Sequence, residues 1–123
     1  MALLDNLYHI TAQTTLPEDE GGGAVYCLAL HPDSAIYQAH FPGRPITPGA
    51  CMIQIVEELA RQYFADATLH VRSITNLKFL ALLEPQHHST VEVVLSGTPS
   101  LLRATFRDGS LLFARLALSF VIS

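Results

Sequence analysis

The stretch AHFPGRPITPGACMIQIVEELA, residues 39–60, decides the fold of this chain because it joins a proline- and glycine-rich loop directly to an apolar helix. Prolines fix the backbone φ angle and donate no backbone hydrogen bond, while glycines let another group approach the main chain closely. The prolines and glycines of the loop are Pro42, Gly43, Pro45, Pro48 and Gly49. The pattern predicts a rigid niche of ligand size beside His40, between an extended segment and the helix.

The helix is predicted to start at the end of this loop. Thr47 is a good N-cap and Pro48 suits the first helical position, so the backbone amides from Gly49 to Cys51 are expected to be unpaired donors. They would lie at the positive end of the helix dipole, which can polarise a carbonyl group. From residue 48 to about residue 64 apolar side chains occupy most positions, which predicts a largely buried helix.

The remaining segments predict an antiparallel sheet wrapped around this helix. Alternating or β-branched runs are typical of strands, and the polar segment 17–23 and the pair Asp108-Gly109 are typical of turns. The predicted strands cover residues 8–15, 24–30, 68–82, 90–97, 100–107 and 111–122. The last of them is apolar on both faces, so it is expected to lie inside the sheet.

Composition limits the class of protein. The chain has 123 residues, of which 50% are hydrophobic, so we expect a single domain over residues 1–123. A formal net charge of −4 argues against nucleic-acid binding, which needs a basic surface. The N-terminus has no basic leader and no apolar run approaches the roughly 20 residues of a membrane-spanning helix, so we expect a cytoplasmic protein without a membrane segment.

The cysteines and histidines indicate no metal or organic cofactor. Cys27 and Cys51 form no CxxC motif and are expected to be reduced. Cys51 is expected to be a small buried residue, with a dipole-activated thiol as the alternative. The adjacent His87 and His88 leave open only a weak surface metal site in a predicted loop.

Three short motifs precede the helix: His40-Phe41-Pro42-Gly43, Pro45-Ile46 and Pro48-Gly49. Together with the helix they resemble the signature of the FabZ/FabA-type 3-hydroxyacyl-(acyl carrier protein) dehydratases, and the run ITNLKF at 74–79 resembles the strand that follows the family's central helix. The resemblance implies an α+β hotdog fold, in which an antiparallel β-sheet wraps around one long helix. It also implies a homodimer with its sites at the subunit interface.

The resemblance implies roles for individual residues. His40 would be the base that removes the C2 proton of a 3-hydroxyacyl thioester, since imidazole titrates near neutral pH. The amide of Gly49 would bind the thioester oxygen, and Phe41, Gly43 and Pro48 would line the substrate site. The implied activity is dehydration to a trans-2-enoyl thioester in fatty-acid or related lipid biosynthesis.

One departure from the family pattern bears on the reaction. The family has a carboxylate fourteen residues after the histidine, where this chain has Gln54, and tends to have glutamine one turn later, where this chain has Glu58. A carboxamide can orient a hydroxyl group but supplies no proton. Either Gln54 only orients the hydroxyl and His40 makes both proton transfers, or Glu58 reaches the site, or the chain binds acyl thioesters without turnover, alone or beside a catalytic partner chain.

Two further expectations concern the carrier and a rival enzyme class. Arg44 and Lys78 are candidate docking residues for an acidic acyl carrier protein, and a coenzyme A thioester would also suit them. A hotdog thioesterase would need an activated water, which Gln54 and Glu58 could position, but the loop motif favours dehydration.

Overall fold

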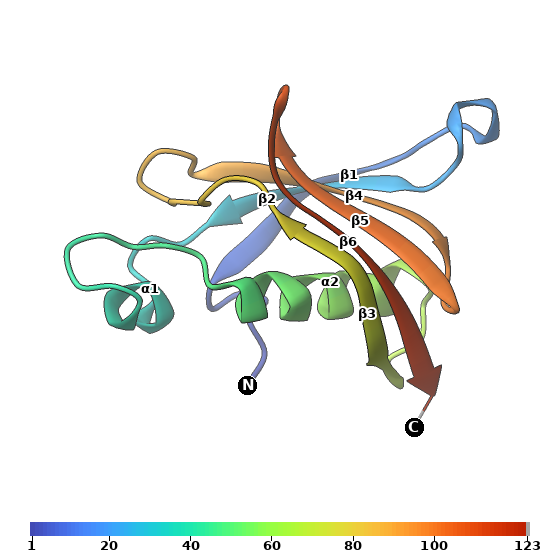
Figure 1. The fold of residues 1–123 in the computed structure, drawn as a ribbon, viewed down its shortest axis with the longest axis horizontal. Coiled ribbons are helices and arrows are strands. Elements are labelled where there is room, and N and C mark those ends of the chain that lie inside the picture. The colour runs from blue at the N-terminus through green and yellow to red at the C-terminus, as the bar shows by residue number, and fades with distance from the viewer. Residues whose placement is uncertain (123) are drawn as a thin grey trace.

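The computed structural model describes residues 1–122 and shows a six-stranded antiparallel sheet curved over one long helix (Figure 1). The strands lie in the order β1-β2-β4-β5-β6-β3. The elements are β1 (Tyr8–Thr15), a 3-10 turn (Glu18–Glu20), β2 (Ala24–Leu30), α1 (Ala35–Ala39), α2 (Gly49–Tyr63), β3 (Leu69–Phe79), β4 (Thr90–Thr98), β5 (Leu101–Asp108) and β6 (Leu111–Ile122). None of the helices described within residues 1–122 has the length and apolarity needed to cross a membrane.

The strands follow the predicted segments closely. β6 pairs with β5 on one side and with β3 on the other, so the prediction of an interior strand is confirmed. On β5 the inward residues Leu102, Ala104 and Phe106 are buried, as the alternation of apolar and polar residues predicts. Gly109, with φ of 58°, follows the last residue of β5 in the predicted hairpin turn.

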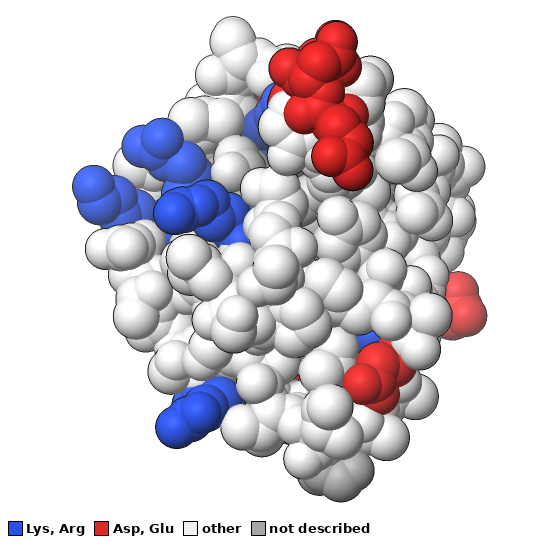
Figure 2. Space-filling view, turned by 90° about the vertical axis from the view of Figure 1, so that its right-hand side faces the viewer, with Lys and Arg blue, Asp and Glu red and all other residues white. Residues whose placement is uncertain are grey.

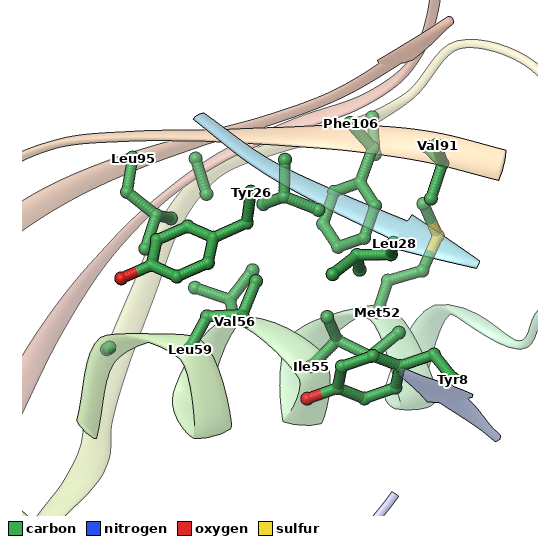
Figure 3. Close-up of a cluster of buried hydrophobic side chains, with 14 of the residues drawn as sticks. Tyr8, Tyr26, Leu28, Met52, Ile55, Val56, Leu59, Val91, Leu95 and Phe106 are labelled. Carbon is green, nitrogen blue, oxygen red and sulfur yellow. The ribbon is translucent and has the colours of Figure 1, made fainter. Parts of the chain in front are cut away.

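The core lies between the sheet and α2. Figure 3 shows side chains from the sheet pointing toward the upper face of α2, where apolar side chains at helical spacing meet them. The helix contributes Met52, Ile55, Val56 and Leu59, and the sheet contributes Tyr26, Leu28, Val91, Leu95 and Phe106. Burial of a side chain of this size stabilises a fold by roughly 1.5–3 kcal/mol, so this interface holds α2 firmly under the sheet.

A short helix stands where the sequence predicted an extended segment before His40. α1 forms because the Ser34 hydroxyl accepts a hydrogen bond from the Ile36 amide at 3.4 Å, capping the first turn. Tyr37 is fully buried and its hydroxyl lies 2.7 Å from the Thr47 hydroxyl. The extended prediction was therefore wrong, because the cap and the buried tyrosine favour a helical turn.

The start of α2 is one residue later than predicted. Pro48, with extended backbone angles, is the N-cap, and Gly49 is the first helical residue. Thr47 does not cap the helix, because its hydroxyl binds Tyr37 and its amide donates to the Leu83 carbonyl at 2.8 Å. Burial raises the pKa of Tyr37 to about 12, so this hydroxyl pair stays neutral.

Candidate active site

The loop that carries His40 is held by backbone hydrogen bonds on both sides of the histidine. The His40 amide donates to the Ile36 carbonyl at 3.0 Å, and its carbonyl accepts from the Ile46 amide at 2.9 Å. Phe41 and Arg44 exchange two backbone hydrogen bonds, at 3.1 and 2.9 Å, across the turn between them. The His40 side chain is exposed and its ring meets that of Phe41 edge-on, at 5.8 Å between ring centroids. A rigid loop thus presents an accessible imidazole.

Arg44 ties this loop to the segment after β3. Its Nε lies 2.8 Å from Oε1 of Glu84, and the other oxygen of Glu84 lies 3.2 Å from Nδ1 of His87. The hydrogen bond from Arg44 lowers the pKa of Glu84 below its ordinary value. Arg44 therefore supports the loop in this chain, and its predicted role in carrier docking stays a proposal.

The two histidines in this segment have separate partners. His87 contacts Glu84, whereas Nδ1 of His88 lies 2.7 Å from Oδ2 of Asp108. Within residues 1–122 no group of three or more His, Cys, Asp or Glu side chains is arranged to hold a metal ion.

The N-terminus of α2 lies beneath the ring of Phe79, at the end of β3. A Cβ atom added to Gly49 would lie 2.5 Å from Cζ of Phe79, so any larger residue here would push the ring aside. The Cys51 amide was expected to be an unpaired donor, and this expectation was wrong, because the amide donates to the Pro48 carbonyl at 3.0 Å. The Gly49 and Ala50 amides have no acceptor among residues 1–122, so they are the donors that this helix end offers.

Cys51 itself is half-buried on the first turn of α2. Burial raises the pKa of its thiol, which is the opposite of activation by the helix dipole. The side chain packs against the core cluster, in agreement with the prediction of a small apolar residue.

Gln54 projects from α2 toward the N-terminal segment. Its Nε2 donates to the Met1 carbonyl and to Oε2 of Glu58, the latter at 3.1 Å. Both partners can only accept, so the orientation of the carboxamide is determined by its surroundings. Oε1 is left as an acceptor without a partner among residues 1–122.

Glu58 is buried and anchors the N-terminal segment to α2. Its carboxylate accepts hydrogen bonds from the Leu3 amide at 2.7 Å and the Leu4 amide at 2.9 Å. The Tyr8 hydroxyl donates a third at 2.8 Å. Burial and the nearby carboxylate raise the pKa of Tyr8, which keeps this hydroxyl a donor. Glu58 is thus committed to structural partners, which does not favour the hypothesis that it serves as the catalytic acid.

The predicted site residues lie in separate regions of one chain. Gln54 and Glu58 line a cavity of about 620 Å³ beside α2, together with Glu57, Arg61 and the N-terminal segment. Phe41 and Gly43 line a different cavity of about 240 Å³. Neither cavity includes His40. Lys78 lies on the outer face of the sheet, beside Arg103 and Arg115.

Sequence reasoning missed two residues that shape these regions. The Tyr8 hydroxyl is one of the hydrogen-bond donors to the Glu58 carboxylate. The sequence predicted that Tyr8 lies in a strand but not that it contacts Glu58. Phe79 covers Gly49, and it ends the ITNLKF run that was singled out for its likeness to a family strand. The position of Phe79 at the end of this run was the signal that could have identified it.

A family profile described as ApeI-like, ApeI dehydratase, matches residues 16–110, so the chain belongs to the ApeI-like dehydratase family. Among curated relatives, it is 27% identical over 92 residues to the 3-hydroxyacyl-[acyl-carrier-protein] dehydratase FabZ of Lactiplantibacillus plantarum, over 69% of this chain and 63% of that protein. It is also 27% identical to FabZ of Pediococcus pentosaceus, over 69% of this chain and 62% of the relative. The chain thus spans less than two thirds of the length of either relative.

Solved structures show the same fold. The dehydratase heterocomplex ApeI:P from Xenorhabdus doucetiae contains a chain that matches with a TM-score of 0.75 and 20% identity, over 90% of this chain and 95% of that one. An uncharacterised protein from Erwinia carotovora subsp. atroseptica matches with a TM-score of 0.74 and 21% identity, over 94% and 97% of the two chains. The hotdog fold implied by the loop motif is confirmed.

Proposed function

We propose that this chain is a 3-hydroxyacyl thioester dehydratase in which His40 is the sole proton-transfer residue and Gln54 orients the departing hydroxyl group. The observation that carries the proposal is the rigid, exposed placement of His40 on a loop braced by backbone hydrogen bonds to Ile36 and Ile46. Membership of a dehydratase family supports it, as do the FabZ relatives, which are named for this reaction. The pathway proposed is fatty-acid or related lipid biosynthesis in the cytoplasm.

The proposed reaction needs one base, one oxyanion donor and one group that positions the hydroxyl. The imidazole of His40 takes the proton from C2, and electrons move to form the C2–C3 double bond while the C3–O bond breaks. The same imidazolium then returns the proton to the departing hydroxide, so that water leaves. The Gly49 and Ala50 amides stabilise the negative charge on the thioester oxygen.

Gln54 suits the role of positioning the hydroxyl group because its Oε1, which has no partner among residues 1–122, is a hydrogen-bond acceptor. Its Nε2 is held by Glu58 and Met1, so Oε1 can receive a hydrogen bond from the substrate's 3-hydroxyl group. A positioned acid typically contributes roughly 10²- to 10⁴-fold to a rate, so an enzyme without one should be slow.

A complete site requires a second chain in this proposal. The cavities that hold Gln54 and the loop residues are separate within one chain. By resemblance to the family we propose a homodimer, in which the His40 loop of one copy faces α2 of the other. The substrate would arrive on an acyl carrier protein or on coenzyme A.

The second candidate is a non-catalytic acyl-thioester-binding or partner subunit. It is favoured by the engagement of Glu58 with Leu3, Leu4 and Tyr8, which commits this carboxylate to structural partners. The ApeI:P structure is named as a heterocomplex, so one chain of this fold can assemble with a different one. In that case the chain would contribute binding or stability to an assembly rather than the acid of the reaction.

Hydration of trans-2-enoyl thioesters, followed by loss of their ultraviolet absorbance, separates the two candidates. The purified wild-type chain should hydrate at least one substrate in a series of increasing acyl length, and the Glu58→Gln variant should keep activity whenever it folds. Loss of activity in a folded Glu58→Gln variant would bring Glu58 into the mechanism. No turnover by the wild-type chain at any length would favour the partner subunit.

A further inference from the structure

The outer face of the sheet, opposite α2, carries a hollow of about 360 Å³ over β3, β5 and β6. Three basic side chains surround it, with two polar side chains and a small floor residue between them. These residues are Lys78, Arg103, Arg115, Asn76, Thr105 and Ala117. Its volume lies at the lower end of the roughly 300–1,000 Å³ typical of small-molecule sites.

The strand register brings the basic residues together. Lys78 on β3 and Thr105 on β5 are both direct partners of Arg115 on β6. Arg103 is the partner of Ala117, two residues further along β6. Side chains two apart in a strand share a face, so all three cations project outward around the short side chain of Ala117.

The cations of this hollow lack acidic partners within residues 1–122. Five of the chain's seven Lys and Arg residues lie on these three strands, in a chain whose formal net charge is −4. Among residues 1–122, Arg107 is the one of those five that is in an ion pair, at 3.0 Å from Glu92. Figure 2 shows basic side chains gathered on one side of a molecular face and the acidic side chains in separate groups. Three unpaired like charges repel each other, so an anion bound among them would be stabilised.

We propose that this hollow binds a phosphate or diphosphate group. The planar guanidinium groups of Arg103 and Arg115 can each donate two parallel hydrogen bonds to phosphate oxygens. Lys78 adds a point charge, and the Thr105 hydroxyl and Asn76 amide add neutral donors. An acidic protein surface would instead bury on the order of 800 Å² per partner over a broad interface, whereas these donors converge on one small hollow.

The hollow and the start of α2 lie on opposite faces of β3, which is an edge strand of the sheet. Lys78 faces the hollow and directly precedes Phe79, whose ring covers Gly49, so a ligand arm that joins the two places would pass around this edge. A thioester bound at that helix end would carry a phosphate on its pantetheine arm, as a diphosphate in coenzyme A or as a phosphodiester on a carrier protein. This assignment of the source rests on the proposed dehydratase function, whereas the phosphate site itself does not.

Isothermal titration calorimetry of the full chain with inorganic pyrophosphate tests the site without any acyl group. We expect wild-type binding that weakens as salt rises, and affinity at least about tenfold lower in Arg103→Gln and in Arg115→Gln. Arg72→Gln is the matched control, because it removes the same charge from β3 outside the hollow and should bind as the wild type does. Absence of wild-type binding, or equal weakening in all three variants, would overturn the site.

Titrations with coenzyme A and with 4′-phosphopantetheine then distinguish the sources. Tighter binding of coenzyme A, lost in Arg103→Gln, supports a diphosphate carrier. Equal binding of both ligands, lost in the same variant, supports the single phosphate that a carrier protein's arm shares with them. Phosphate binding by a chain that fails to hydrate enoyl thioesters would contradict only the proposed function, and hydration by a chain that binds no phosphate would contradict only this site.

Discussion

Gln54 and Glu58 lie one turn apart on α2, and Nε2 of Gln54 donates a hydrogen bond to Oε2 of Glu58 at 3.1 Å. The pair reverses the order of acid and amide that the family resemblance implies. In this chain the acid holds the N-terminal segment, and the amide presents its oxygen without a partner among residues 1–122. In the proposed function, the exchange thus separates anchoring by Glu58 from positioning of the substrate by Gln54.

Restoring the family order should raise the hydration rate. The double variant Gln54→Glu with Glu58→Gln supplies a carboxylic acid where the proposed site needs one, so a gain of roughly 10²- to 10⁴-fold is expected. The single variant Gln54→Glu is the control, because it places two carboxylates within hydrogen-bonding distance and should be less stable at pH 8 than at pH 5. A double variant that folds but gains no rate would show that the pocket no longer fits the reaction.

Removing the charge of Glu58 should destabilise the fold. A neutral carboxamide in Glu58→Gln has one acceptor oxygen, so it leaves at least one donor among the Leu3 amide, the Leu4 amide and the Tyr8 hydroxyl unpaired. We expect a loss of about 1–3 kcal/mol in the free energy of unfolding, measured in urea. Tyr8→Phe, which removes one donor and leaves the carboxylate, should cost less. Equal stability of Glu58→Gln and the wild type would refute the anchoring role.

Gly49→Ala should affect activity more than stability. The new Cβ would meet Cζ of Phe79 at 2.5 Å, but that ring is 54% exposed and can swing away. Alanine also favours helix over glycine by about 1 kcal/mol, which offsets part of the cost. The expected result is a small change in the urea midpoint together with slower hydration. Adding Phe79→Leu should recover part of the rate, and no recovery would mean that the ring does not shape the site.

Acid should loosen the contact between Arg44 and Glu84. Arg44 lowers the pKa of Glu84 in the folded protein. The stability gained from this pair is therefore fully present above the ordinary carboxyl pKa of about 4.3. It is lost as the pH falls through the lowered pKa that Glu84 has in the folded protein. Unfolding free energy measured between pH 6 and pH 3 should therefore fall more steeply in the wild type than in Glu84→Gln. Identical slopes in the two proteins would argue against this coupling.

Local sequence patterns predicted most of the fold. The strands and α2 follow from periods of two and 3.6 residues and from turn residues such as Gly109. α1 was missed because it depends on a cap by Ser34 and on a hydroxyl pair between Tyr37 and Thr47, neither of which has a periodic signature. The same hydroxyl pair explains the misplaced N-cap of α2.

The site was less predictable because its partners are distant in sequence. The HFPG motif identified the loop, but Glu58 binds the Leu3 amide across a separation of 55 residues. No local sequence pattern shows that a buried carboxylate will accept hydrogen bonds from backbone amides so distant in the sequence. The basic hollow depends in a similar way on the register of β3, β5 and β6, which brings together charges that are scattered along the chain.

The central claim is that His40 performs the proton transfer, and comparing hydration of a trans-2-enoyl thioester by His40→Ala and His9→Ala tests it most directly. His9 is an exposed histidine of β1 whose ring contacts His31 and which has no proposed role in the reaction, so its removal controls for the loss of an imidazole. We predict that His40→Ala loses at least about 10²-fold in rate while His9→Ala keeps the wild-type rate. Equal rates in the two variants, with both proteins folded, would contradict the account.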